Sequence, residues 1–273
     1  MTSEAGWRQK ILDWLTSVDY GARQTDSLVK KHPGTSSWVL RSSVYGNFIN
    51  GSNTNLLFQG APGVGKTIIS SVVIQDLITR FEQDESVGIA YVYFDRLRRN
   101  EQHPEDIFMS LIKQLVQRRL AVPGDVDNMY RLSGHRSRPK WRRILDCVRS
   151  TILEYARVIL IFDGINEYSE VYRDKLLKEV LKMQAECGLS LFVTSRPDER
   201  LTGILESFSS LEIRAHDDDL QKFIAENICR MQPFLSEESN GFHDEVVQKL
   251  VQMANGRFEL NSGTRFRPYS LTF

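Results

Sequence analysis

The stretch that decides the fold is Gly60-Ala61-Pro62-Gly63-Val64-Gly65-Lys66-Thr67. It matches the phosphate-binding pattern G-x-x-x-x-G-K-[ST] at every fixed position. Glycines let backbone amides approach phosphate oxygens, and these amides converge on an anion at the positive end of the following helix. Lys66 is expected to supply a cation for the β- and γ-phosphates, and Thr67 a hydroxyl ligand for Mg²⁺. The eight residues therefore predict a site for a nucleoside triphosphate, either ATP or GTP.

The sequence on either side of this loop supports the prediction. Residues 55–59 form a short apolar run that suits a buried strand, and residues 66–80 have the apolar period of a helix. Strand, glycine-rich turn and helix in this order are the setting that the pattern requires, so a turn without a ligand is the weaker alternative. No N-K-x-D stretch typical of guanine selection stands in the expected place, which favours ATP over GTP.

A second motif follows the most continuous apolar run of the chain, residues 157–162, which stops at Asp163. An aspartate at the end of a buried strand is expected beside Thr67, where it holds Mg²⁺ directly or through water. Glu167 follows four residues later, close enough to polarise the water that attacks the γ-phosphate. The alternatives are a helix-capping carboxylate for Asp163 and an ordinary acidic turn residue for Glu167.

A third candidate is Arg196, which follows the predicted strand at residues 189–194. In a P-loop sheet this strand is expected between the other two motif strands. Arg196 could then reach a γ-phosphate or couple its presence to a neighbouring domain. The alternative is an ordinary surface arginine.

Strands and helices alternate along the whole chain, which indicates an α/β fold with a mostly parallel, five-stranded sheet between helices. The further strands are predicted at residues 86–94 and 210–214, and the further helices at 7–30, 38–50, 104–120, 140–156, 171–187 and 220–255. The expected organisation is an N-terminal helical region (1–50), a nucleotide-binding domain (51–215), a helical segment (216–256) and an irregular tail (257–273).

Composition sets broad limits on partners and location. The 273 residues include 35 Lys and Arg and 35 Asp and Glu, so no general attraction to nucleic acid or acidic membranes is implied. A basic cluster at residues 135–143 is interpreted as a solvated loop and helix start, with a contact to nucleic acid or an acidic partner as the alternative. Three cysteines in no metal-ligand spacing argue against a disulfide framework, and no run approaches the ~20 apolar residues of a membrane span. We expect a cytoplasmic protein without a specific nucleic-acid or membrane partner.

Taken together, these stretches resemble a NACHT domain, a branch of the signalling (STAND) P-loop ATPases. The resemblance is closest to the fungal heterokaryon-incompatibility and ankyrin-type NACHT proteins, of the nephrocystin-like N-terminal type. It covers residues 11 to about 256. Apart from the P-loop, it is carried by WLTSVDYGARQTDSLVKKHPGTSSWVL (14–40), VGIAYVYFDRLRRNEQHPEDIFMSLIKQL (87–115), VILIFDGINEY (158–168) and LFVTSRP (191–197).

The resemblance implies an intracellular switch in which ADP holds a closed state and ATP promotes opening and oligomerisation. It assigns Lys66 and Thr67 to phosphate and Mg²⁺, Asp163 to the Walker B acid and Arg196 to the sensor arginine. It also implies a sheet of the ASCE type in which the P-loop strand is flanked by the strands that end at Asp163 and Thr194.

The chain departs from this family pattern in two places. Many members have D-G-x-D-E where this chain has D-G-I-N-E (163–167). Asn166 can form hydrogen bonds but cannot act as a base, so hydrolysis depends on Glu167 and is expected to be slow. After residues 254–256 the usual winged-helix domain and repeats do not follow, so the chain is interpreted as truncated after its nucleotide-binding domain.

Three classes of function remain open. The first is an ATP-binding NACHT switch with slow hydrolysis, which associates with itself or with full-length NACHT proteins in a fungal innate-immunity or incompatibility-type pathway. The second is an efficient kinase or helicase-like ATPase, for which no substrate lid or helicase motif is present. The third is a non-catalytic nucleotide-binding module or truncated regulator of full-length relatives. Turnover separates them, because a switch should hydrolyse at ~10⁻⁴ to 10⁻² s⁻¹ without a partner.

Overall fold

A parallel β-sheet forms the centre of the computed structural model, which describes residues 4–98, 102–134, 137–231 and 247–251. Its five strands lie in the order β2-β3-β4-β1-β5, and every neighbouring pair is parallel. The strands are β1 (Asn55–Gln59), β2 (Val87–Tyr93), β3 (Arg157–Asp163), β4 (Ser190–Ser195) and β5 (Ser209–Glu212). The predicted α/β fold with a five-stranded parallel sheet is thus confirmed.

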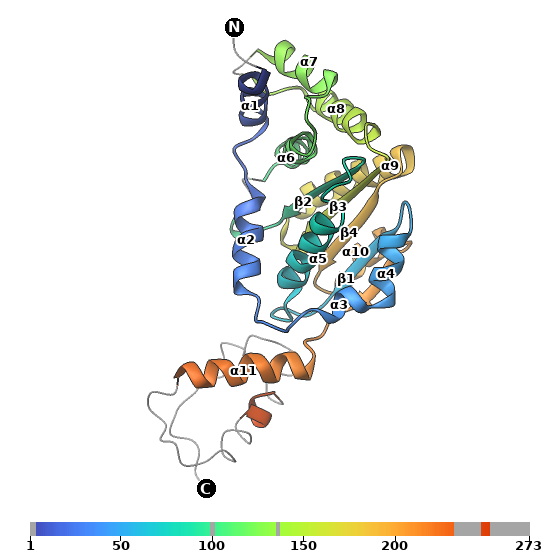
Figure 1. The fold of residues 1–273 in the computed structure, drawn as a ribbon. Helices are drawn as coiled ribbons and strands as arrows, with labels where there is room; N and C mark the ends of the chain where they lie inside the picture. The colour runs from blue at the N-terminus through green and yellow to red at the C-terminus, as the bar shows by residue number, and fades with distance from the viewer. Residues whose placement is uncertain (1–3, 99–101, 135–136, 232–246, 252–273) are drawn as a thin grey trace.

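Helices cover both faces of this sheet (Figure 1). The helices of the described residues are α1 (Glu4–Leu15), α2 (Tyr20–Lys30), α3 (Trp38–Arg41), α4 (Ser43–Asn50), α5 (Lys66–Arg80), α6 (Pro104–Gln117), α7 (Gly124–Ser133), α8 (Trp141–Leu153), α9 (Glu170–Cys187), α10 (Glu199–Ile204) and α11 (Asp217–Met231), with 3₁₀ turns η1 (Arg96–Arg98) and η2 (Ile165–Glu167). Helix α11 lies apart from the sheet (Figure 1). The connection through α5 runs one way across the sheet and that through α9 runs the other. Because such crossovers are right-handed, α5 and α9 lie on opposite faces.

The strand order settles two expectations about the neighbours of the P-loop strand β1. The strand at residues 189–194 was expected between the other two motif strands, and β4 does lie between β3 and β1. The sheet implied by the family resemblance, with β1 flanked by the Asp163 and Thr194 strands, is wrong. β1 pairs with β4 and β5, and β4 separates it from β3.

Several predicted helices divide or fall partly outside the described residues. The helix predicted at 7–30 is two helices, because Asp19 accepts a hydrogen bond from the Gly21 amide and begins α2 anew. The helix predicted at 38–50 divides at Ser42, which caps α4 in the same way. Helices α7 and α10 were not predicted. The helix predicted at 220–255 is described as α11 and a short stretch at 247–251, and the tail at 257–273 lies outside the described residues.

Helix α2 is held firmly against α5, which follows the P-loop, and against the end of β2. Gln24 donates to the Ser71 carbonyl of α5 over 2.9 Å and accepts a short hydrogen bond from the Tyr93 hydroxyl at the end of β2. All three side chains are buried. α2 therefore forms a fixed wall beside the start of α5.

None of the described helices has the length and apolar character needed to cross a bilayer.

Candidate nucleotide-binding site

The P-loop connects β1 to α5 with a backbone that only glycine adopts easily. Gly63 and Gly65 have φ angles of 78° and 89°, in the left-handed region that disfavours other residues. Gly65 accepts the first hydrogen bond of α5, from Ile69 N over 2.9 Å. Lys66 Nζ donates to the carbonyl oxygens of Gly60 and Ala61, both over 2.9 Å. The lysine thus lies over the concave side of the loop.

Gly60 is needed for a different reason, namely close packing at the start of the loop. A Cβ at this position would lie 2.6 Å from the Ile213 carbonyl oxygen and 2.8 Å from Val64 Cγ2. The Gly60 amide also donates to the Ser195 carbonyl over 3.1 Å. The start of the P-loop is therefore held between the end of β4 and the segment after β5.

Gly60→Ala is expected to destabilise the fold by about 1–3 kcal/mol, the usual range for overpacking against groups that cannot move away. The matched control is Gly46→Ala in α4, where an added Cβ meets nothing within 4 Å and a helical alanine is favoured by about 0.5–1 kcal/mol. Denaturant unfolding of both variants measures the difference. Equal stabilities for the two variants would contradict this view of the loop.

Asp163 lies at the carboxyl end of β3, only 3% exposed, and accepts hydrogen bonds from three hydroxyls. Thr67 Oγ1 donates to its Oδ2 over 2.8 Å. Ser70 and Thr194 donate to its Oδ1 over 2.6 and 2.7 Å. The structure thus places the predicted metal ligands Thr67 and Asp163 in direct contact. Their hard oxygen atoms are donors that suit Mg²⁺. Ser70 and the Thr194 hydroxyl were not singled out from the sequence.

Glu167 and Arg196 meet at the same end of the site. Arg196 NH2 lies 3.7 Å from Glu167 Oε1, and the two side chains are 41% and 34% exposed. The backbone amide of Arg196 donates to Asn166 Oδ1 over 2.8 Å. Gly164, with φ of 69°, makes the turn from β3 into η2. The two predicted catalytic side chains are therefore neighbours and accessible to a ligand.

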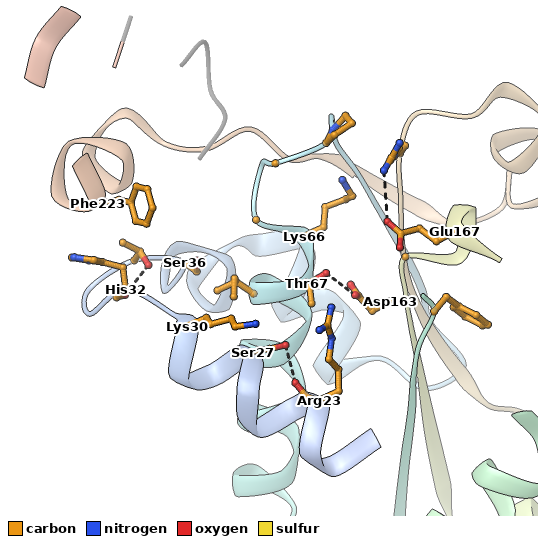
Figure 2. Close-up of a pocket in the computed structure, with 18 residues that line it drawn as sticks. Arg23, Ser27, Lys30, His32, Ser36, Lys66, Thr67, Asp163, Glu167 and Phe223 are labelled. Atoms are coloured by element: carbon orange, nitrogen blue, oxygen red, sulfur yellow. Dashed lines mark hydrogen bonds and ion pairs between the residues drawn. The ribbon is translucent and has the colours of Figure 1, made fainter. Parts of the chain in front are cut away.

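A cavity of about 420 Å³ brings the predicted site residues together. Its floor is the P-loop and the start of α5, with Asp163 and Glu167 on one side (Figure 2). On the opposite side lie His32 and Phe223, as Figure 2 shows. The cavity lining includes four Lys or Arg side chains (Arg23, Lys30, Lys66, Arg196) and two carboxylates. A neutral chain thus concentrates positive charge where a polyphosphate would bind.

The wall formed by α2 was missed by the sequence analysis. Arg23, Ser27 and Lys30 line the cavity from this helix. Burial raises the pKa of the Tyr93 hydroxyl, the Asp163 carboxylate raises it further, and the Arg23 guanidinium opposes both. Figure 2 shows the Arg23 side chain pointing from α2 toward Thr67 and Asp163, so this helix brings positive charge to the carboxylate end of the site. No fixed motif marks these residues, so only packing reveals them.

The far wall joins the loop between α2 and α3 (residues 31–37) to α11. The backbone amide of Ser36 donates to Oδ2 of Asp219, an 8% exposed carboxylate, over 2.9 Å. The His32 and Phe223 rings meet edge to face with centroids 6.2 Å apart. This wall offers aromatic surface, in contrast to the charged phosphate end, and it too was missed from the sequence.

The family model described as Nephrocystin 3, N-terminal, matches residues 34–196, more than half of the chain. The chain belongs to the nephrocystin 3 N-terminal family. The match spans the P-loop, Asp163, Glu167 and Arg196, so the nephrocystin-like part of the resemblance is confirmed. Helices α2 and α11, which complete the cavity, lie outside the residues that the family model matches.

No curated protein matches the chain. Solved structures with partial likeness include C. elegans PCH-2 (12% identity, TM-score 0.41, 92% of this chain and 59% of that one). Others are Cdc6p from Pyrobaculum aerophilum (14%, 0.49, 91% and 62%) and AMPPCP-bound DnaA from Aquifex aeolicus (14%, 0.41, 84% and 60%). The chain spans about 60% of the length of these solved chains.

Proposed function

We propose that this chain is a NACHT-type signalling switch that binds ATP with Mg²⁺ and hydrolyses it slowly. The observation that carries the proposal is the single cavity in which the P-loop, the Thr67–Asp163 contact and the Glu167–Arg196 pair face one another. The resemblance to fungal NACHT proteins supports a role in a cytoplasmic immunity or incompatibility-type pathway. The proposed nucleotide-binding domain is residues 51–215, with residues 1–50 and 216–256 contributing walls.

The distribution of groups in the cavity suggests how a nucleotide lies. The triphosphate lies along the P-loop beside Lys66, with its terminal phosphate toward Glu167 and Arg196. The base points toward His32 and Phe223, on the opposite side of Lys66 in Figure 2. Aromatic rings suit a purine, whereas the opposite end has the cations and carboxylates that phosphate chemistry needs.

The side chains of the site have distinct roles in this proposal. Lys66 exchanges its two carbonyl partners for phosphate oxygens, which are stronger acceptors because they are charged. Thr67 and Asp163 would hold Mg²⁺, which neutralises phosphate charge when bound. Arg196 exchanges Glu167 for the terminal phosphate, and Glu167 then orients the attacking water. ADP lacks that phosphate and leaves the Glu167–Arg196 pair in place.

Nucleotide state is coupled to assembly through the walls from α2 and α11. Both helices touch the cavity yet extend away from it, so a ligand that contacts them changes what they present to a second chain. The output is self-association or association with full-length relatives. The competing function is a nucleotide-binding module without turnover, in which Arg196 stays paired with Glu167.

Turnover and assembly measured on one sample separate these functions. With ATP, the switch predicts hydrolysis at ~10⁻⁴ to 10⁻² s⁻¹. Light scattering should show a larger particle with a non-hydrolysable ATP analogue than with ADP. Binding without turnover and without a change in size identifies the passive module. Turnover of tens per second with an added acceptor would contradict both functions in favour of an efficient enzyme.

A further inference from the structure

The segment formed by the last residue of β4 and the loop after it (residues 195–198, called here the Arg196 loop) is attached to both other motifs of the site. The Gly60 amide at the start of the P-loop donates to the Ser195 carbonyl over 3.1 Å. The Arg196 amide donates to Asn166 Oδ1, on η2, over 2.8 Å. The Ser195 carbonyl and the Arg196 amide belong to one peptide unit, so the main chain on the N-terminal side of the Arg196 Cα is fixed to the P-loop and to the turn that follows β3.

A buried guanidinium holds the far end of the same loop. Arg173, in the first turn of α9, is 3% exposed, and its NH1 donates to Asp198 Oδ2 over 3.0 Å. The other carboxylate oxygen of Asp198 accepts from Leu201 N over 3.1 Å and caps α10. A buried charge is costly unless it is paired, so Arg173 strongly favours the position of Asp198 that satisfies it.

The side chain of Arg196 is held far less tightly than its backbone. It is 41% exposed, and its only described ionic contact is to Glu167 at 3.7 Å. Exposed pairs at such distances contribute little energy. A fixed main chain with a weakly held guanidinium is the arrangement needed for a side chain that changes partners without moving its loop.

We propose that Asn166 and Arg173 are positioning residues that hold the Arg196 main chain while its guanidinium exchanges Glu167 for the terminal phosphate. In this proposal Asn166 does not mark the loss of a catalytic base. Its side-chain oxygen is the hydrogen-bond acceptor that fixes the Arg196 loop. This inference rests on the proposed function, because it assumes a nucleotide whose terminal phosphate reaches Arg196.

Substitutions at position 166 separate a hydrogen-bond acceptor from a base. Asn166→Asp keeps an oxygen that accepts from the Arg196 amide, whereas Asn166→Ala removes it. The matched control is Arg200→Ala in α10. Arg200 lies beside the same region, and its ion pairs within the described residues are with Glu170 and Asp174.

The readout is the ratio of affinities for a non-hydrolysable ATP analogue and ADP, titrated with Mg²⁺ on the full chain. Arg196→Ala should lower the ratio about tenfold, the value of one charge-assisted hydrogen bond. Asn166→Ala should lower it to the same level, with ADP affinity and melting temperature near wild type. Asn166→Asp and Arg200→Ala should keep the wild-type ratio. The double variant Asn166→Ala/Arg196→Ala should show no further loss.

Two results would overturn the inference while the proposed function stands. One is a wild-type ratio in Asn166→Ala alongside a lowered ratio in Arg196→Ala. The other is a large rise in ATP turnover in Asn166→Asp, which would make position 166 a base position. A folded wild-type chain that binds neither nucleotide would overturn the proposed function, and this inference with it. Arg173→Lys tests the hydrogen bond between Arg173 and Asp198. The shorter lysine side chain should lose this bond and lower the ratio of ATP-analogue to ADP affinity.

Discussion

Lys66→Ala is expected to weaken the binding of Mg²⁺–ATP by at least about 100-fold. The lysine supplies the mobile cation of the P-loop, and loss of one or two charge-assisted hydrogen bonds to phosphate accounts for this factor. The effect on stability should be small, because the loop carbonyls to which Nζ donates can be satisfied by water. Calorimetric titration of wild type and variant gives the two affinities directly.

The matched control for this experiment is Lys182→Ala. Lys182 lies on α9, is 59% exposed and pairs only loosely with Glu186 at 3.8 Å. The Lys182→Ala variant loses the same charge from a surface away from the cavity, so its affinity for ATP should equal that of the wild-type chain. If Lys66→Ala binds ATP within threefold of this control, the P-loop is not where the phosphates bind.

Asp163→Asn is expected to remove the dependence of ATP binding on Mg²⁺. In wild type, affinity should fall when EDTA replaces Mg²⁺, whereas the variant should bind equally in both. The amide is similar in shape to the carboxylate, and the hydroxyls of Thr67, Ser70 and Thr194 can rotate to accept as well as donate. We therefore expect the variant to fold, at a cost of about 1–3 kcal/mol in the free energy of unfolding.

Asp76→Asn provides the control, because this carboxylate is also on α5 and also accepts from a hydroxyl, that of Tyr45, over 2.7 Å. It does not line the cavity. Its ATP binding should keep the full response to Mg²⁺. If the ATP affinity of Asp163→Asn responds to Mg²⁺ as that of this control does, Asp163 is not a ligand of the metal.

The floor of the site could be predicted from sequence because its chemistry is carried by short motifs. The P-loop needs backbone conformations that glycine adopts easily. Asp163 ends a continuous apolar run, which is typical of a strand buried on both faces of a sheet. Parallel strands bring their carboxyl ends to one edge of a sheet, so Asp163 and Arg196 were expected near Thr67. In the structure Thr67, Asp163 and Arg196 line one cavity, and their roles stay proposals.

The walls of the cavity could not be predicted, because they depend on contacts between distant segments. The Ser36–Asp219 hydrogen bond joins residues separated by 183 positions, and neither residue belongs to a recognisable motif. The sequence also favoured one helix at residues 7–30, since the cap at Asp19 does not interrupt the apolar period. Asn166 shows a different limit. Its departure from the family pattern suggested a missing base, whereas its amide oxygen accepts from the Arg196 backbone.

The central claim is that the cavity above the P-loop binds one nucleoside triphosphate. Calorimetric titration of the wild-type chain with a non-hydrolysable ATP analogue and Mg²⁺ tests it most directly. We predict saturable binding of one molecule per chain, weakened by EDTA and competed by ADP. A chain that melts cooperatively yet gives no saturable heat with either ATP or GTP would contradict the account.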